Sequence, residues 1–240
     1  MKLKFIGIGS AFNTELGNTS AYIKENGVLL LLDCGELTFD RILRMNLLNG
    51  VNEVHVAVTH THPDHIGSLG SLIFYCYFVK NIKLTFHAAN TDFIRLLQDM
   101  GITEEHCKFD HCNANYNFAI ENLNIRLIFI EENHVKEIMS FGILLVKNPN
   151  ELYREVVFYS GDCCNIKNDT INALKTGQID YLYQDTCKAD YDDNAHVSLR
   201  KLTELIPVEL RDKVFIMHID SGFDRSEAEG LGFNVVEIEK

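Results

Sequence analysis

Residues 60–65 read His-Thr-His-Pro-Asp-His and follow directly on the apolar run 54–58. An extended backbone sends side chains two residues apart to the same face, so His60 and His62 point together. Past the proline the chain turns, and the pair Asp64-His65 then points towards a second position nearby. Imidazole and carboxylate groups suit Zn²⁺. The segment therefore predicts ligands for two adjacent metals on the rigid end of a β-strand.

The length of 240 residues predicts a single domain, 1–240, large enough to bury a substantial core. A hydrophobic content of 46% and a charged content of 23% are typical of globular proteins. We expect no signal peptide and no membrane span, because the most apolar stretch, 66–79, is too short to cross a bilayer. The seven cysteines lack the spacing of a disulfide framework, which indicates reduced thiols and a cytoplasmic location.

The charge balance constrains the partners. Against 34 acidic residues stand 22 basic ones, and the formal net charge is −12. A protein that grips a long nucleic acid usually presents a basic face that neutralises several phosphates. This sequence contains no dense run of Lys or Arg. The balance favours a small substrate over a long polyanion.

Short β-rich runs alternate with helical ones along the whole chain, without a linker or a repeat. This order predicts two sheets packed face to face with helices outside them. The predicted strands are 2–8, 21–24, 28–33, 54–59, 83–87, 125–130, 141–147, 156–160, 181–184, 214–218 and 234–238. The predicted helices are 39–48, 66–80, 91–100, 169–176 and 197–206.

Three further metal-competent residues stand at the ends of predicted strands. His134 follows the run 125–130, Asp162 closes the run 155–162, and His218 closes the run 214–218. A strand end is a rigid place from which to hold a ligand. Each residue alone would more often be structural, but together with segment 60–65 they indicate a metal site. Gly161 also predicts a close approach of the backbone to a neighbour.

This series of residues resembles the ligand set of the metallo-β-lactamase fold hydrolases, in the same order and over nearly the whole chain. The resemblance implies a four-layer αββα sandwich with two zinc ions at one sheet edge; Mn²⁺ or another divalent ion is the alternative. Two metals about 3.5–4 Å apart can stabilise the oxygens of a phosphodiester during its cleavage. Asp64 would serve both as a ligand and in catalysis. The implied ligands are His60, His62 and His134 for one metal, Asp64, His65 and His218 for the other, and Asp162 between them.

Other segments are similar to ribonuclease Z, namely 5–12, 18–20, 33–36, 180–186 and 196–198. In that branch an acidic residue orients a non-ligand histidine, which protonates the leaving oxygen. Asp185 and His196 match those two positions. The chemistry is reasonable, because an imidazolium assists the departure of an alkoxide and a carboxylate fixes its tautomer. The alternative for His196 is that it only caps the helix predicted from residue 197.

The sequence departs from ribonuclease Z in the region that holds tRNA. A long Gly/Pro-rich arm is missing between His134 and Asp162, which are joined by a short strand-turn-strand segment. The opening loop keeps Asn18 but lacks the usual Pro and Arg, and the histidine motif ends in Ser198 rather than Thr.

Without the arm, the sequence resembles compact relatives that open cyclic mononucleotides, above all the phage anti-Pycsar enzymes. That resemblance implies hydrolysis of 3′,5′-cyclic nucleotides to nucleoside monophosphates, a homodimer and a location in the host cytoplasm. Two alternatives stay open. One is a tRNA 3′-end endonuclease that works without the arm, and the other is a non-catalytic nucleotide-binding protein of the same fold.

Overall fold

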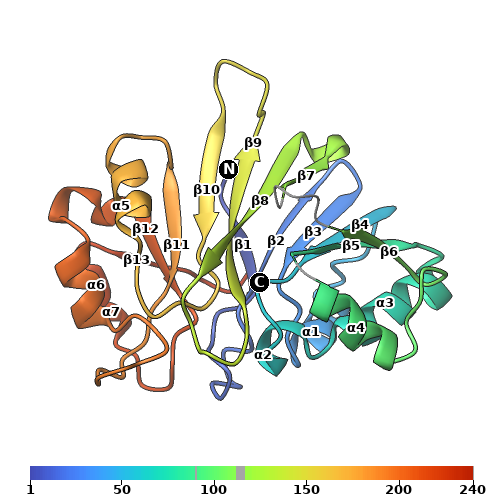
Figure 1. Ribbon diagram of the computed structural model, residues 1–240, viewed down its shortest axis with the longest axis horizontal. Coiled ribbons are helices and arrows are strands. Elements are labelled where there is room, and N and C mark those ends of the chain that lie inside the picture. Colours follow the sequence, from blue (N-terminus) through green and yellow to red (C-terminus); the bar gives the residue numbers. More distant parts are fainter. Residues whose placement is uncertain (90, 112–116, 240) are drawn as a thin grey trace.

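The computed structural model describes residues 1–89, 91–111 and 117–239. Two β-sheets face each other in the middle of the molecule, and helices cover their outer faces (Figure 1). Helices α1, α3 and α4 flank one sheet, while α5, α6 and α7 flank the other. The predicted four-layer αββα sandwich is therefore confirmed.

The first sheet has six strands in the order β1-β2-β3-β4-β5-β6. Strands β1 to β3 pair antiparallel, whereas β3 to β6 pair parallel. The central strand β3 reads Val-Leu-Leu-Leu-Leu and is buried throughout, as expected for a strand covered on both faces. The bounds are β1 (Lys4–Gly7), β2 (Ser20–Glu25), β3 (Val28–Leu32), β4 (Glu53–Ala57), β5 (Leu84–Ala88) and β6 (Cys107–His111).

The second sheet has seven strands in the order β13-β12-β11-β10-β9-β8-β7. Strands β7 to β10 pair antiparallel and β10 to β13 pair parallel. The parallel strands end at the same edge of the sheet, where the site is built. The bounds are β7 (Asn117–Ile120), β8 (Ile125–Glu132), β9 (Ser140–Lys147), β10 (Glu155–Tyr159), β11 (Tyr181–Asp185), β12 (Val214–Met217) and β13 (Asn234–Val235).

The helices are short, and most connect successive strands. The α-helices are α1 (Thr38–Arg44), α2 (Pro63–Ile66), α3 (Leu69–Tyr75), α4 (Thr91–Asp99), α5 (Asn168–Lys175), α6 (Leu199–Leu205) and α7 (Arg225–Gly230). A π-helical turn η1 (Cys76–Lys80) extends α3, and η2 (Glu121–Leu123) and η3 (Val208–Lys213) are 3₁₀ helices. Among the residues that the structure describes, no helix is long and apolar enough to cross a membrane.

The prediction of a helix over 66–80 is confirmed for residues 69–80, which form α3 and the π-helical turn η1, but its start was placed three residues too early. Helix α2 ends at Ile66 and α3 begins at Leu69, and the hydroxyl of Ser68 between them bonds to other parts of the chain. Its Oγ donates to the carbonyl of Gly35 at 2.5 Å and accepts from the amide of Phe39 at 3.1 Å. The interruption therefore ties the loop after β4 to the loop that leads into α1.

Among the elements that were not predicted are β6, β7 and α7. The first two lie at the outer edges of their sheets and carry polar residues such as Lys108 and Asn117, so their apolar pattern is weak. Helix α7 does have a local signal. The side chain of Asp224 accepts a hydrogen bond from the amide of Glu227 at 3.1 Å, the N-cap contact expected where Asp precedes Glu by three residues.

Candidate active site

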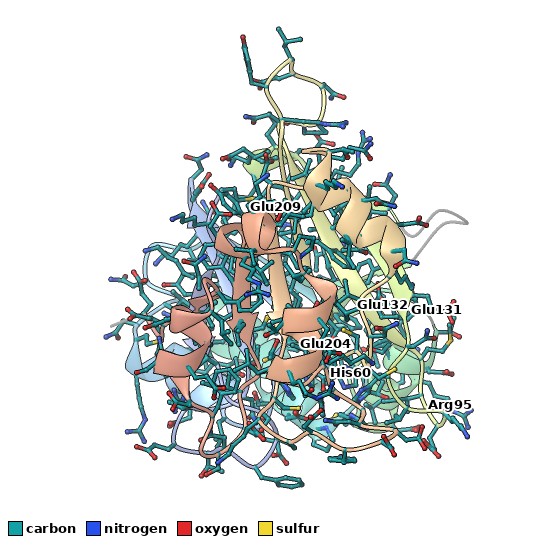
Figure 2. All side chains as sticks on the ribbon, turned by 90° about the vertical axis from the view of Figure 1, so that its left-hand side faces the viewer. His60, Arg95, Glu131, Glu132, Glu204 and Glu209 are labelled. Carbon is teal, nitrogen blue, oxygen red and sulfur yellow. The ribbon has the colours of Figure 1, made fainter. Side chains whose placement is uncertain are left out.

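The seven residues predicted as metal ligands come together at the end of the molecule where β4, β8, β10 and β12 finish. Figure 2 shows His60 in the lower half of the molecule, near the rim formed by the loops. Four of the seven are almost fully buried, which is unusual for imidazole and carboxylate groups that lack a strong partner. These four are His60, His65, Asp162 and His218.

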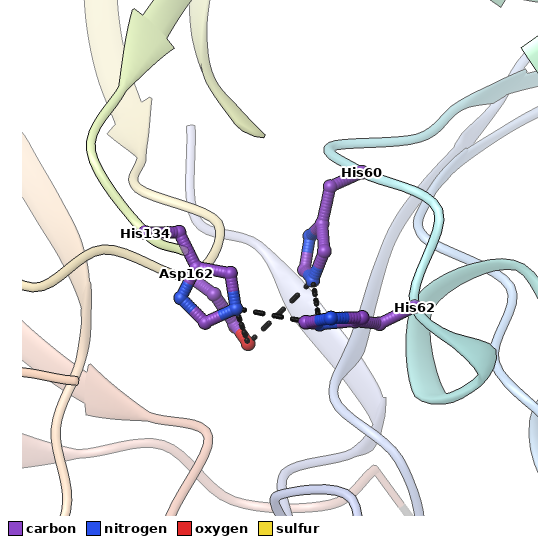
Figure 3. Close-up of side chains that lie close together, drawn as sticks. All are labelled: His60, His62, His134 and Asp162. Atoms are coloured by element: carbon purple, nitrogen blue, oxygen red, sulfur yellow. Dashed lines mark hydrogen bonds and ion pairs between the residues drawn. The ribbon is translucent and has the colours of Figure 1, made fainter. Parts of the chain in front are cut away.

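The first group surrounds a point between three imidazoles (Figure 3). The Nε2 atom of His60 lies 3.0 Å from Nδ1 of His62, and Nε2 of His134 lies 3.3 Å from that same Nδ1. The Oδ2 atom of Asp162 completes the group, 3.7 Å from Nε2 of His60 and 3.8 Å from Nε2 of His134.

The second group contains two imidazoles and two carboxylates. The Oδ2 atom of Asp64 lies 3.3 Å from Nε2 of His65 and 3.3 Å from Nε2 of His218. The Oδ1 atom of Asp162 lies 3.3 Å from Nε2 of His65 and 3.5 Å from Nε2 of His218. In this group, as in the first, the four potential ligand atoms lie within 4.8 Å of one another.

Asp162 belongs to both groups and divides its two oxygens between them. Oδ2 faces the first group and Oδ1 the second, which is the arrangement of a bridging carboxylate. Burial would raise the pKa of this carboxyl, but the imidazoles of His218 and His65 hold it well below its usual value. The carboxylate is therefore ionised and available to a cation.

The residues fit a pair of divalent cations. Oδ1 of Asp162 and Nε2 of His65 are buried without a hydrogen-bond partner in the described part of the chain. Buried polar atoms in native proteins are normally paired, so a missing partner calls for an explanation. Three groups of four share Asp162, and the two that consist of predicted ligands match the chemistry of zinc and related ions; the third joins Asp162 and His218 to Asp185 and His196.

The outward-facing nitrogens of three histidines form hydrogen bonds, and that of His218 lies near a carboxylate. Nδ1 of His134 contacts the carbonyl of Ala195 at 3.0 Å, and a hydrogen bond to this oxygen requires the nitrogen to be the donor. The other contacts join Nδ1 of His60 to Oγ1 of Thr59 (3.0 Å), Nδ1 of His65 to Oδ2 of Asp33 (3.0 Å) and Nδ1 of His218 to Oδ1 of Asp185 (3.2 Å). Such contacts orient the rings and set the tautomer that leaves the inner nitrogen free for a metal.

Asp33 was not predicted to act in the site, although it orients His65. It follows the buried strand β3 directly and has a φ of 64°, in the left-handed region that Asp tolerates better than most residues. Its carboxylate accepts hydrogen bonds from the amide of Thr59 (2.8 Å) and the hydroxyl of Tyr159 (3.0 Å). A carboxylate placed immediately after five buried apolar residues was the signal in the sequence.

We expect Tyr159→Phe to lower the free energy of unfolding by about 1–3 kcal/mol, because it removes a donor from a buried carboxylate. Urea denaturation measures this change. The matched control is Tyr153→Phe, since Tyr153 is 84% exposed and should shift the unfolding free energy by less than about 0.5 kcal/mol. Equal stability of the two variants would contradict the role given to the Tyr159 hydroxyl.

The predicted pair of His196 and Asp185 lies beside the metal-ligand groups. Nδ1 of His196 contacts Oδ2 of Asp185 at 2.8 Å, and this carboxylate also accepts from the amide of Cys163 at 3.1 Å. Burial would lower the pKa of His196, but the Asp185 carboxylate outweighs it and raises the pKa above its usual value. The His196 side chain is 26% exposed, so the ring can reach a bound molecule.

The interpretation of His196 as a helix cap is wrong. Helix α6 begins at Leu199, and its N-cap is Ser198, whose Oγ accepts from the amide of Lys201 at 3.2 Å. His196 therefore does not cap the helix. Asp185 has a second role that was not predicted, since its other oxygen forms an ion pair with the metal-ligand candidate His218.

Gly161 has the close contacts that were predicted for it. Its φ is 59°, and a Cβ atom there would lie 2.7 Å from the carbonyl oxygen of Phe141 and 2.8 Å from Cβ of Thr59. The loop that carries Asp162 can therefore pack against the loop after β4 only because residue 161 has no side chain. This contact brings Asp162 to the histidines.

A cavity of about 550 Å³ opens in front of both groups. The predicted ligands that line it are His62, Asp64, His134, Asp162 and His218, together with His196. Phe12, Glu36, Tyr191 and Asp220 also line it. A molecule bound in this cavity can thus meet the metal-ligand groups and the His196 ring at the same time.

A two-sheet sandwich with paired His/Asp groups at its strand ends defines the metallo-β-lactamase fold. Solved structures with this architecture agree over almost the whole length. A diphosphatase of the PhnP family has a TM-score of 0.75 at 15% identity, with 99% of this chain and 95% of that chain covered. Human tRNase Z, short form, has a TM-score of 0.66 at 17% identity, with 100% and 97% covered.

Within this fold, the family model described as anti-Pycsar protein Apyc1 matches residues 1–237, and the chain belongs to that family. An anti-Pycsar protein Apyc1 from Paenibacillus harenae is 24% identical over 249 residues, covering 100% of this chain and 98% of the relative. Another from Bacillus phage vB_BveM-Goe7 is 28% identical over 243 residues, covering 90% and 88%. The resemblance inferred from the sequence motifs is confirmed.

Proposed function

We propose that this protein is a metal-dependent phosphodiesterase that hydrolyses small 3′,5′-cyclic nucleotides to nucleoside monophosphates. The observation that carries the proposal is the position of the His196–Asp185 pair beside two metal-ligand groups joined by Asp162. A protein that only binds nucleotides does not need a proton donor oriented by a carboxylate beside the metal-ligand groups. The anti-Pycsar name of the family supports a cyclic nucleotide that serves as a defence signal.

The proposed cofactors are two Zn²⁺ ions per chain, with Mn²⁺ as the alternative. One would be held by His60, His62 and His134, the other by Asp64, His65 and His218, with Asp162 contacting both. When bound, two such ions supply a centre that activates the nucleophile and stabilises charge on the phosphate oxygens.

The residues around this centre have distinct tasks. His196 donates a proton to the ribose oxygen that leaves phosphorus, and Asp185 holds the ring in the orientation needed for that transfer. Asp33 and Thr59 fix the rings of His65 and His60 from behind. Asp64 belongs to the second group and also lines the cavity, so its carboxylate faces the space in which the substrate would bind.

The substrate class follows from size and charge. A cavity of about 550 Å³ is in the range of sites for small molecules. Its mouth includes the acidic residues Glu36 and Asp220, and the chain carries a net charge of −12, both unfavourable for a long polyanion. The connections between β8, β9 and β10 span only residues 133–139 and 148–154, which leaves no arm for tRNA.

The test is to incubate the metal-loaded protein with 3′,5′-cyclic nucleotides, linear dinucleotides and a precursor tRNA, and to identify the products. We expect the cyclic mononucleotides to be opened to monophosphates with broad base tolerance, and the precursor tRNA to be cleaved poorly. The opposite ranking of kcat/KM would move the protein to tRNA 3′-end processing. Retention of intact nucleotide without turnover would make it a nucleotide-binding protein.

We further propose that the chain acts as a single domain, 1–240, in the cytoplasm, or the host cytoplasm for a phage-encoded form, and as a homodimer. The seven cysteines without a framework spacing support a reducing compartment. Analytical ultracentrifugation of the metal-loaded protein tests the dimer.

A further inference from the structure

Two aromatic rings line the cavity without being buried by the rest of the protein. Phe12 is 95% exposed and Tyr191 is 64% exposed, and both line the same cavity as His196. Leaving a phenylalanine ring in water gives up the free energy that its burial would provide. An exposed ring at the mouth of a site is therefore most simply explained by a ligand that covers it.

Both rings are carried by loops anchored to the segment that directly follows His218. The carbonyl of Ile219 accepts from the amide of Ser10 at 3.0 Å and from Nδ2 of Asn13 at 3.1 Å, which fixes the loop of Phe12 on either side. These contacts anchor the backbone that carries Phe12 to the residue that follows the metal-ligand candidate His218.

The loop of Tyr191 is anchored to the next residue of the same segment. The carboxylate of Asp220 accepts from the amides of Lys188 (2.7 Å) and Ala189 (3.2 Å). The next residue, Asp190, accepts from Oγ of Ser198 at 2.7 Å. The loops of both rings are thus anchored to residues 219 and 220, which directly follow His218.

The side chain of Asn194, which lines the same cavity, already makes hydrogen bonds within the protein. Nδ2 of Asn194 donates to the carbonyl of Ala189 at 2.8 Å, and its Oδ1 accepts from the amide of His196 at 3.1 Å. The carboxylate of Asp220 is engaged by the two amides named above. Both Asn194 and Asp220 thus already make hydrogen bonds within the protein, whereas the rings of Phe12 and Tyr191 are exposed.

We propose that Phe12 and Tyr191 determine substrate binding by stacking on the planar base of the nucleotide whose phosphate lies at the metal-ligand groups. This inference rests on the proposed function and adds the residues that recognise the base. Stacking without edge contacts tolerates every base, because each has a π-face, and it favours purines over pyrimidines through their larger area.

The experiment compares cyclic AMP with ribose 3′,5′-cyclic phosphate, which has the same phosphodiester but no base. For Phe12→Ala and Tyr191→Ala we expect the ratio of kcat/KM for cyclic AMP to that for the baseless compound to fall about tenfold to a hundredfold, the range of a lost base–aromatic stack. The loss should appear mainly in KM, and Phe12→Trp should retain the ratio. The control Tyr153→Ala removes an equally exposed ring on the β9–β10 connection and should leave the ratio unchanged.

An unchanged ratio in both variants would overturn the inference while leaving the phosphodiesterase activity in place. So would a change of dimer to monomer in Phe12→Ala, because the ring would then belong to a contact between subunits. A second measurement needs no turnover: the Kd values of AMP and of ribose 5-phosphate for the metal-loaded protein. If no cyclic nucleotide is hydrolysed but the preference for AMP still falls in the two variants, the proposed function fails and the base-binding role stands.

Discussion

Removal of divalent cations by a chelator should abolish turnover, and elemental analysis of the active protein should give close to two metal ions per chain. The expectation rests on Asp162, whose two oxygens face two different groups of histidines. A single tetrahedral ion could use at most four of the seven candidate ligands and would leave buried imidazoles and a carboxylate without a partner. Re-addition of Zn²⁺ or Mn²⁺ should restore activity.

The same expectation can be tested one residue at a time. His62→Ala removes a ligand of the first group, whereas Asp162→Ala removes the shared one, so the second change should lose more metal than the first. His106→Ala is the matched control, since Nδ1 of His106 accepts from the amide of Thr103 at 3.2 Å and the residue belongs to neither group. A folded and fully active preparation without metal would end the two-metal interpretation.

His196→Ala should lower turnover of a cyclic nucleotide by about a hundredfold to ten-thousandfold, the usual contribution of a positioned acid. Metal content should stay unchanged, because all seven assigned ligands of the two groups remain when the His196 ring is removed. A nitrophenyl phosphodiester is the control substrate, since its leaving group needs little protonation and its cleavage should be affected much less. Loss of metal in this variant, or full activity on the cyclic nucleotide, would show that the assignment is wrong.

Asp185→Asn should affect both contacts of that carboxylate, the one with His196 and the one with His218. One oxygen holds His196 and the other forms an ion pair with His218, so this variant should lose turnover and also bind metal more weakly. Removing an orienting partner of a ligand typically weakens metal binding by about 10–100-fold. Isothermal titration with Zn²⁺, run beside His196→Ala, distinguishes the two effects.

Much of this site can be read from the sequence because its residues stand where strands end. Alternation along an extended chain is a local property, so the direction of His60 and His62 is predictable without the rest of the fold. The same holds for the positions of His134 and His218 after apolar runs. The four-layer architecture also follows from the order of β-rich and helical segments, and its resemblance to a known fold.

What the sequence could not predict depends on distances between segments that are remote along the chain. Edge strands β6 and β7 have too little apolar pattern to be recognised alone, and at the break between α2 and α3 the hydroxyl of Ser68 bonds to Gly35 in another loop. Local propensity contains no information about such partners, so the predicted helix over 66–80 was too long.

The sequence by itself determined the order of residues capable of binding metal, and its resemblance to ribonuclease Z predicted the pair that would transfer a proton. Only the tertiary structure decided that Asp162 directs one oxygen to each group, that Asp33 orients His65, and that one segment after His218 supports both exposed rings. The physical reason is that residue type and strand period are local properties, whereas the atom that each side chain turns towards its neighbour is set by the packing of two sheets and the loops between them.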